Sequence, residues 1–125
     1  MEDRKRILVA DDDPDLIEIL KMDLSFQGYE VFEAANGKEA LDIAAKEKID
    51  LILLDVMMPY IDGYHVASTL SSQMGTSVPK IVIMTSRDTV REKGIAMMSG
   101  AVSMIQKPFD MEALHKKIKE ILEHP

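Results

Sequence analysis

Carboxylate, hydroxyl and ammonium side chains lie at the carboxyl ends of four short apolar runs of this sequence. Apolar runs of this length are typical of strands buried on both faces of a parallel sheet, and the carboxyl ends of such strands meet at one edge. We therefore expect five side chains to lie together at that edge. They are Asp11, Asp12, Asp55, Thr85 and Lys107.

Three of these five side chains are carboxylates, and their mutual repulsion predicts a bound cation or proton. Hard oxygen ligands that retain a few waters suit Mg²⁺. A carboxylate beside a metal, a hydroxyl and a lysine can attack a phosphoryl group, because the metal and the lysine neutralise charge on the phosphoryl oxygens. Asp55 is the expected nucleophile, since it ends the central strand between the other groups.

Strands and helices in alternation must bring these residues together. Four continuous apolar runs and one alternating segment predict five strands, with the more polar alternating segment at one edge of the sheet. The last run, which Ser103 interrupts, is expected at the other edge. In chain order the five segments are residues 7–10, 29–34, 51–54, 81–84 and 101–105.

Helix-start and helix-stop signals occupy the stretches between those strands. Asp13 is the expected cap of the first helix, with Pro14 at its first position, and Gly28 ends it. Asn36 and Glu39 form a variant capping box for the second helix. The third helix is expected at about residues 63–74, the fourth at roughly 88–99, and the fifth after residue 110.

Five β–α pairs in strict alternation predict a three-layer α/β/α sandwich around a five-stranded parallel sheet. The 125 residues suit a single domain, 1–125, with a core at about residues 5–123. The 22 acidic and 15 basic residues give a formal net charge of −7, which favours a cation or a basic partner over direct nucleic-acid binding.

Other functional classes are excluded by what the sequence lacks. It contains no cysteine, which rules out disulfides, thiolate zinc sites and cysteine catalysis. Its apolar runs are too short for a signal-peptide core or a membrane span, so we expect a soluble, cytoplasmic chain without membrane contact.

With these motifs in place, the sequence resembles the receiver domains of two-component response regulators. The resemblance covers nearly the whole chain, and its segments occur in the order typical of that family. It implies the flavodoxin-like fold of chemotaxis regulators, with strand order 2-1-3-4-5. The matching segments are ILVADDD (7–13), LDVMMP (54–59) with Asp62 and Gly63, MTS (84–86) and KPF (107–109).

The resemblance also implies a role for each residue of the acidic cluster. Asp55 resembles the phosphoacceptor of the family. Asp11 and Asp12 resemble the acidic pair that holds Mg²⁺, Asp12 directly and Asp11 largely through water, with Mn²⁺ as an expected substitute. Met57 would supply its backbone carbonyl to the same metal, a role that leaves its side chain free to vary.

Two further roles follow from the resemblance at the remaining strand ends. Thr85 resembles the switch hydroxyl that moves to a phosphoryl oxygen, and Lys107 resembles the lysine that pairs with another phosphoryl oxygen. The peptide bond between Lys107 and Pro108 is expected to be cis, as is usual in the family.

As a receiver, the chain would take a phosphoryl group from a phosphohistidine on a sensor histidine kinase or a histidine phosphotransfer protein. It would catalyse only its own phosphorylation and dephosphorylation, and so would not be a turnover enzyme. Phosphorylation would switch the surface around the fourth helix, the fifth strand and the fifth helix, where a downstream partner or output domain docks.

Met104 departs from the family pattern, because many receivers carry an aromatic residue three positions before the lysine. That aromatic residue rotates inward when the switch hydroxyl moves. A methionine can fill the vacated space in several rotamers, which favours a weaker switch. The other interpretation is that Met104 simply packs the edge strand, and the sequence leaves both open.

Arg87 and Met57 border the expected phosphorylation site, each two residues beyond a site residue. The resemblance implies that these positions tune the attack of water on the aspartyl phosphate. We expect slower hydrolysis here than in a variant with smaller residues at both positions.

The sequence contains ten methionines, several of them near the expected output surface. They could form an adaptable docking face, but we expect most of them, including Met97, Met98 and Met111, to fill the core. The histidines are expected to be solvated surface residues. They are His65, His115 and His124.

Three alternatives remain beside this interpretation. The chain could be a receiver fragment of a longer regulator with a DNA-binding or enzymatic output domain, because Pro125 fits a linker as well as a terminus. A flavin- or nucleotide-binding flavodoxin-like module would need amide donors where residues 11–13 place three carboxylates. A haloacid-dehalogenase-type phosphatase would want a second carboxylate at position 57, where methionine stands.

Overall fold

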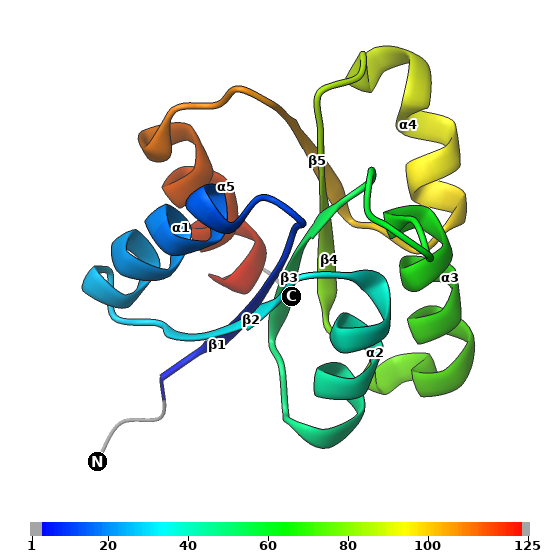
Figure 1. The fold of residues 1–125 in the computed structure, drawn as a ribbon, viewed down its shortest axis with the longest axis horizontal. Helices are drawn as coiled ribbons and strands as arrows, with labels where there is room; N and C mark the ends of the chain where they lie inside the picture. Colours follow the sequence, from blue (N-terminus) through cyan, green and yellow to red (C-terminus); the bar gives the residue numbers. More distant parts are fainter. Residues whose placement is uncertain (1–3, 124–125) are drawn as a thin grey trace.

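The computed structural model describes residues 4–123 and shows a sheet between two layers of helices (Figure 1). The sheet has the order β2-β1-β3-β4-β5, which confirms the predicted sandwich and its strand order. Neighbouring strands are parallel throughout. The strands are β1 (Arg6–Ala10), β2 (Glu30–Ala34), β3 (Leu51–Asp55), β4 (Lys80–Thr85) and β5 (Ser103–Gln106).

Helices cover both faces of the sheet. In Figure 1, α1 and α5 lie together on one side, while α2, α3 and α4 lie on the other. Within residues 4–123, no helix has the length and apolar character needed to cross a membrane. The helices are α1 (Pro14–Phe26), α2 (Gly37–Lys46), α3 (Gly63–Met74), α4 (Thr89–Met98) and α5 (Met111–Glu123), with a short 3-10 helix at Gly75–Ser77.

The central strand β3 explains why the sequence shows continuous apolar runs. Its side chains alternate between the two faces: Leu51 and Leu53 belong to the core under α1 and α5, and Ile52 and Leu54 to the core under α2, α3 and α4. All five residues of β3 are buried. Because helices cover both faces, both alternating sets must be apolar.

Short polar side chains begin the helices where the sequence predicts them. The Asp13 carboxylate accepts hydrogen bonds from the backbone N–H groups of Asp15 and Leu16, and so caps α1. The Asn36 side chain accepts from the N–H of Glu39 and caps α2. These caps satisfy N–H groups that a helix leaves unpaired in its first turn. They also determine where the loops at the carboxyl edge of the sheet end.

The fifth strand begins two residues later than predicted. Gly100, with φ of +102°, turns the chain out of α4. The N–H of Val102 donates to the carbonyl of Ile81 (2.8 Å) before the ladder with β4 begins. The strand therefore occupies Ser103–Gln106 rather than residues 101–105, and Lys107 follows it directly.

The prediction that the histidines are solvated is confirmed for His65, which is exposed. It is wrong for His115, which is half-buried between α5 and α1 with its Nε2 against the carboxylate of Asp23. Packing of α5 onto α1 brings these two residues together although 92 positions separate them in sequence. His124 lies outside the described residues.

Candidate functional site

The five predicted site residues lie at the carboxyl edge of the sheet. Asp55 is the last residue of β3 and pairs in register with Met84 of β4, one position before Thr85. Asp11 directly follows β1, where its N–H extends the ladder by donating to Ala34 (3.1 Å). Parallel strands that end together thus place side chains from distant parts of the chain at one edge, as expected.

The three carboxylates converge on one point. Asp11, Asp12 and Asp55 each offer an oxygen, and these oxygens lie within 4.8 Å of one another. Asp11 and Asp55 are buried, whereas Asp12 is exposed at the mouth of the site. Two carboxylates of the cluster are therefore buried and the third faces solvent, so the cluster is accessible to an ion from the side of Asp12.

Lys107 connects two of these carboxylates. Its Nζ donates to Oδ2 of Asp11 (2.6 Å) and to Oδ1 of Asp55 (3.2 Å). The backbone N–H of Lys107 donates to the carbonyl of Thr85 (2.7 Å), which fastens the lysine beside β4. The peptide bond between Lys107 and Pro108 is cis, as the resemblance implied.

One ammonium does not balance three carboxylates. Burial and the neighbouring charge of Asp11 raise the pKa of Asp55, although Lys107 opposes both effects. Burial lowers the pKa of Lys107, but hydrogen bonding and charge from Asp11 and Asp55 outweigh it, so that pKa is raised. The site favours more positive charge than the lysine supplies, and its all-oxygen donors fit Mg²⁺.

Thr85 ends β4 and is fully buried. Its Oγ1 accepts a hydrogen bond from the backbone N–H of Arg87 (3.0 Å), so the hydroxyl is held by the loop between β4 and α4. This bond connects the Thr85 side chain to the backbone of that loop.

Gly63 is a structural requirement of the site that residue chemistry alone does not reveal. Its N–H donates to the carbonyl of Val56 (2.9 Å), and α3 begins against the backbone of Asp55. A Cβ at position 63 would lie 2.2 Å from the carbonyl oxygen of Asp55. Only glycine allows this approach without a backbone shift. The sequence signal is the pair Asp62 and Gly63, which opens the helix that follows β3.

The two residues predicted to border the site, Arg87 and Met57, are in contact. Nη2 of Arg87 lies 3.0 Å from Sδ of Met57, and Nη1 lies 3.3 Å from Oε2 of Glu92. Sequence reasoning missed Glu92 and Tyr64, whose hydroxyl donates to Oε1 of Glu92 (2.6 Å). Glu92 lies in the first turn of α4, five residues after Arg87, and this nearness in sequence was the available signal for the first contact.

The flavin- or nucleotide-binding alternative requires free amides after β1. Here the N–H of Asp13 instead donates to Oδ1 of Asp11 (2.9 Å). Carboxylates occupy the position where a phosphate loop presents N–H groups. The loop after β1 therefore favours a cation over an anionic cofactor.

Met104 is partly buried on β5 and packs against the core under α2, α3 and α4. With Val90, Met97 and neighbouring residues it lines a hollow of about 440 Å³ between α4 and β5. Core filling is confirmed for Met111, but it is wrong for Met97 and Met98, which are 51% and 90% exposed. Those two lie on the outer side of α4, where nothing in the described residues covers them.

Comparison with known proteins identifies the family. A model of the response regulator receiver domain matches residues 7–119. The chain belongs to this family. Response regulator MprA of Mycolicibacterium vanbaalenii is 43% identical over 117 residues, covering 94% of this chain and 50% of that protein. The same protein of Mycobacterium avium shows the same identity and coverage. The chain thus spans about half the length of the curated relatives it matches.

Solved receiver structures share the fold. Chemotaxis protein CheY4 of Vibrio cholerae superposes with a TM-score of 0.90 at 30% identity, covering 96% of this chain and all of that one. Response regulator TrrA of Thermotoga maritima, solved in complex with Mg²⁺ and BeF, gives a TM-score of 0.84 at 36% identity, covering 94% and 99%. The chain is therefore a receiver domain of the two-component signalling type.

Proposed function

We propose that this receiver domain accepts a phosphoryl group on Asp55 in a Mg²⁺-dependent reaction. The observation that carries the proposal is the cluster of Asp11, Asp12 and Asp55 within 4.8 Å, with Nζ of Lys107 bonded to two of the three. The donor is the phosphohistidine of a sensor histidine kinase or a histidine phosphotransfer protein.

In the transfer, a carboxylate oxygen of Asp55 attacks phosphorus and the bond from phosphorus to the donor nitrogen breaks. Lys107 already lies 3.2 Å from Oδ1 of Asp55, where it pairs with a phosphoryl oxygen as charge moves onto the acceptor. Asp11, Asp12, Asp55 and the backbone carbonyl of Met57 would hold Mg²⁺, with Mn²⁺ as a substitute. When bound, the metal neutralises further charge on the phosphoryl oxygens.

The switch that follows involves Thr85. Its hydroxyl leaves the N–H of Arg87 for a phosphoryl oxygen, and the loop before α4 must then rearrange. The surface of α4, β5 and α5 changes as a result. Met104 beside the hollow between α4 and β5 either follows the hydroxyl inward or stays packed, and both interpretations remain open.

The biological setting is also part of the proposal. The chain forms one receiver domain in the cytoplasm, catalysing only its own phosphorylation and dephosphorylation, without contacting nucleic acid or membrane directly. Its output acts through a downstream protein or through an attached output domain, which could bind DNA or carry an enzyme. The coverage of about half of each curated relative supports an attached domain.

The decisive experiment is intact-mass analysis after incubation with Mg²⁺ and acetyl phosphate. The parent protein is expected to gain the mass of one phosphoryl group, and Asp55→Ala to gain none. Asp50→Ala, an aspartate at the opposite end of β3, is the matched control and should be labelled like the parent. An unmodified parent, or an equal adduct on Asp55→Ala, would overturn the proposal.

A further inference from the structure

Four side chains from separate segments form a connected assembly at the mouth of the acidic site. The Arg87 guanidinium donates to Oε2 of Glu92 on α4 (3.3 Å) and to Sδ of Met57 in the loop after β3 (3.0 Å). The other carboxylate oxygen of Glu92 accepts from the hydroxyl of Tyr64 on α3 (2.6 Å). The guanidinium is therefore held from two directions, by α4 and by the loop after Asp55.

Glu92 is the more buried partner of Arg87 in this assembly. Its side chain is 17% exposed, against 48% for Arg87. Burial and the Glu92 carboxylate raise the pKa of Tyr64, so the phenol stays protonated and continues to donate at neutral pH. A partly buried carboxylate with two donors has a defined orientation, and Arg87 takes its position from it.

The assembly borders the approach to the proposed phosphorylation site. A hollow of about 540 Å³ is lined by Asp12, Met57, Tyr64 and Arg87, together with neighbouring loop residues. Asp12 is the solvent-facing member of the carboxylate cluster. The placement of the guanidinium and the thioether therefore determines how open this hollow is to water.

We infer that Glu92 and Tyr64 are positioning residues, which hold Arg87 against Met57 and thereby slow the attack of water on phosphorylated Asp55. The inference rests on the proposed function and adds two residues from helices outside the site. In the reaction that is slowed, water attacks phosphorus, the bond from the Asp55 oxygen to phosphorus breaks, and inorganic phosphate leaves. A released guanidinium would move into solvent and open the hollow.

A purely structural tie between α3 and α4 would behave differently. These helices are also joined at their other ends, where Oγ of Ser71 donates to the carbonyl of Ser99 (3.2 Å). If Glu92 and Tyr64 only added a second tie, their loss would affect stability without depending on Arg87. If they position Arg87, their effect on hydrolysis disappears once Arg87 is absent.

The test measures the first-order loss of phosphate from the parent, Glu92→Gln, Tyr64→Phe, Arg87→Ala and the double variant Arg87→Ala with Glu92→Gln. The domain is labelled with acetyl phosphate and Mg²⁺, freed of donor, and followed by intact mass. We expect about threefold faster loss in Glu92→Gln and Arg87→Ala, about twofold in Tyr64→Phe, and no further gain in the double variant. Glu112→Gln, which removes an exposed carboxylate on α5, should decay like the parent.

A second measurement uses the unphosphorylated protein. In side-chain NMR, the Arg87 guanidinium should show resolved Nη signals in the parent that merge in Glu92→Gln, because rotation is no longer hindered. Unchanged decay in Glu92→Gln, an equal gain in the Arg87→Ala background, or unmerged signals would each overturn the inference while leaving Asp55 as phosphoacceptor. Absence of any adduct on the parent would instead overturn the proposed function and this inference together.

Discussion

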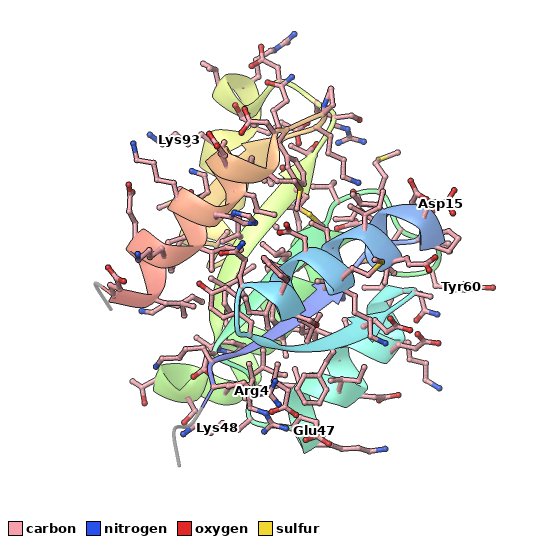
Figure 2. All side chains as sticks on the ribbon, turned by 90° about the vertical axis from the view of Figure 1, so that its left-hand side faces the viewer. Arg4, Asp15, Glu47, Lys48, Tyr60 and Lys93 are labelled. Atoms are coloured by element: carbon pink, nitrogen blue, oxygen red, sulfur yellow. The ribbon has the colours of Figure 1, made fainter. Side chains whose placement is uncertain are left out.

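At each end of the sheet, one basic residue lies near three carboxylates, but the carboxylates are arranged differently at the two ends. At the amino end, the guanidinium of Arg6 on β1 pairs with Glu30 and Glu47, and the backbone N–H of Arg6 donates to Asp50. At the carboxyl end, Lys107 stands beside three aspartates. Figure 2 shows the two ends separated, with Glu47 at the amino end and Asp15 and Tyr60 at the other.

The amino end spreads its carboxylates around the cation. Nη2 and Nε of Arg6 lie 2.9 Å and 3.4 Å from Glu47 and Glu30, whose side chains are both 43% exposed. Asp50 accepts from the backbone N–H of Arg6 (2.8 Å), and the guanidinium lies 4.7 Å from the centre of the Phe32 ring. The two carboxylates paired with the guanidinium are well exposed and come from different elements, so each ion pair is of modest energy.

The carboxyl end concentrates its carboxylates instead. The side chains of Asp11 and Asp55 are 1% and 6% exposed, and their oxygens lie with one of Asp12 inside 4.8 Å. The same count of charges therefore produces structural pairing at one end and an unbalanced anionic site at the other. Burial and convergence distinguish the two clusters, and residue counts do not.

The largest expected difference between the ends concerns phosphoryl transfer. Lys107→Ala should slow labelling of Asp55 by acetyl phosphate about 100-fold, because it removes a preorganised charge from the reacting oxygens. Arg6→Ala, which removes the cation of the amino end, should change the rate by less than about twofold, since that end lies away from the reaction. Both rates are measured by intact mass over time. Equal slowing in the two variants would contradict the assignment of Lys107.

The effect of Mg²⁺ on the melting temperature should also distinguish variants at the two ends, by a smaller amount. At a Mg²⁺ concentration tenfold above its Kd, binding to the folded state adds about 1.4 kcal/mol. For a domain of this size the melting temperature should rise by about 5 °C. Asp12→Asn should lose most of this rise, whereas Glu47→Gln should keep it. Differential scanning calorimetry with and without Mg²⁺ checks both, and a full rise in Asp12→Asn would remove Asp12 from the metal site.

Much of the fold and site is predictable because short sequence patterns agree with the order and packing of the strands. Apolar runs mark strands that are covered on both faces, and Asp13 and Asn36 cap helices by bonds within a few residues. Asp55 ends a strand, and Asp11 and Lys107 directly follow strands, so parallel topology alone brings them together. Each of these features depends on neighbours in sequence or on the order of strands.

Contacts between helices were not predictable in the same way. The bond from Tyr64 to Glu92 joins residues 28 apart, and that between His115 and Asp23 joins residues 92 apart. Both depend on how two helices are rotated on the sheet, which residue types do not specify. The shifted start of β5 has a similar cause, because only its ladder with β4 determines where an interrupted edge strand begins.

The smallest expected effect is on the free energy of unfolding, which should change in opposite directions at the two ends. Asp55 is a buried carboxylate whose raised pKa shows that its charge costs stability at neutral pH, since burial and Asp11 outweigh the bond from Lys107. Without metal, Asp55→Asn should therefore raise the free energy of unfolding by about 1 kcal/mol. Asp50→Asn should lower it by about 0.5 kcal/mol, because a neutral amide oxygen is a weaker acceptor for the N–H of Arg6.

Urea unfolding at pH 7 in the presence of a chelator measures both changes. At this pH both aspartates are charged in the unfolded chain, so the comparison isolates what each charge does in the folded protein. Opposite signs would establish that the charge of Asp55 in its cluster lowers stability, whereas the charge of Asp50 at the amino end raises it. A loss in both variants would mean that Lys107 compensates Asp55 fully, and the anionic excess that favours a cation would rest on Asp11 and Asp12 alone.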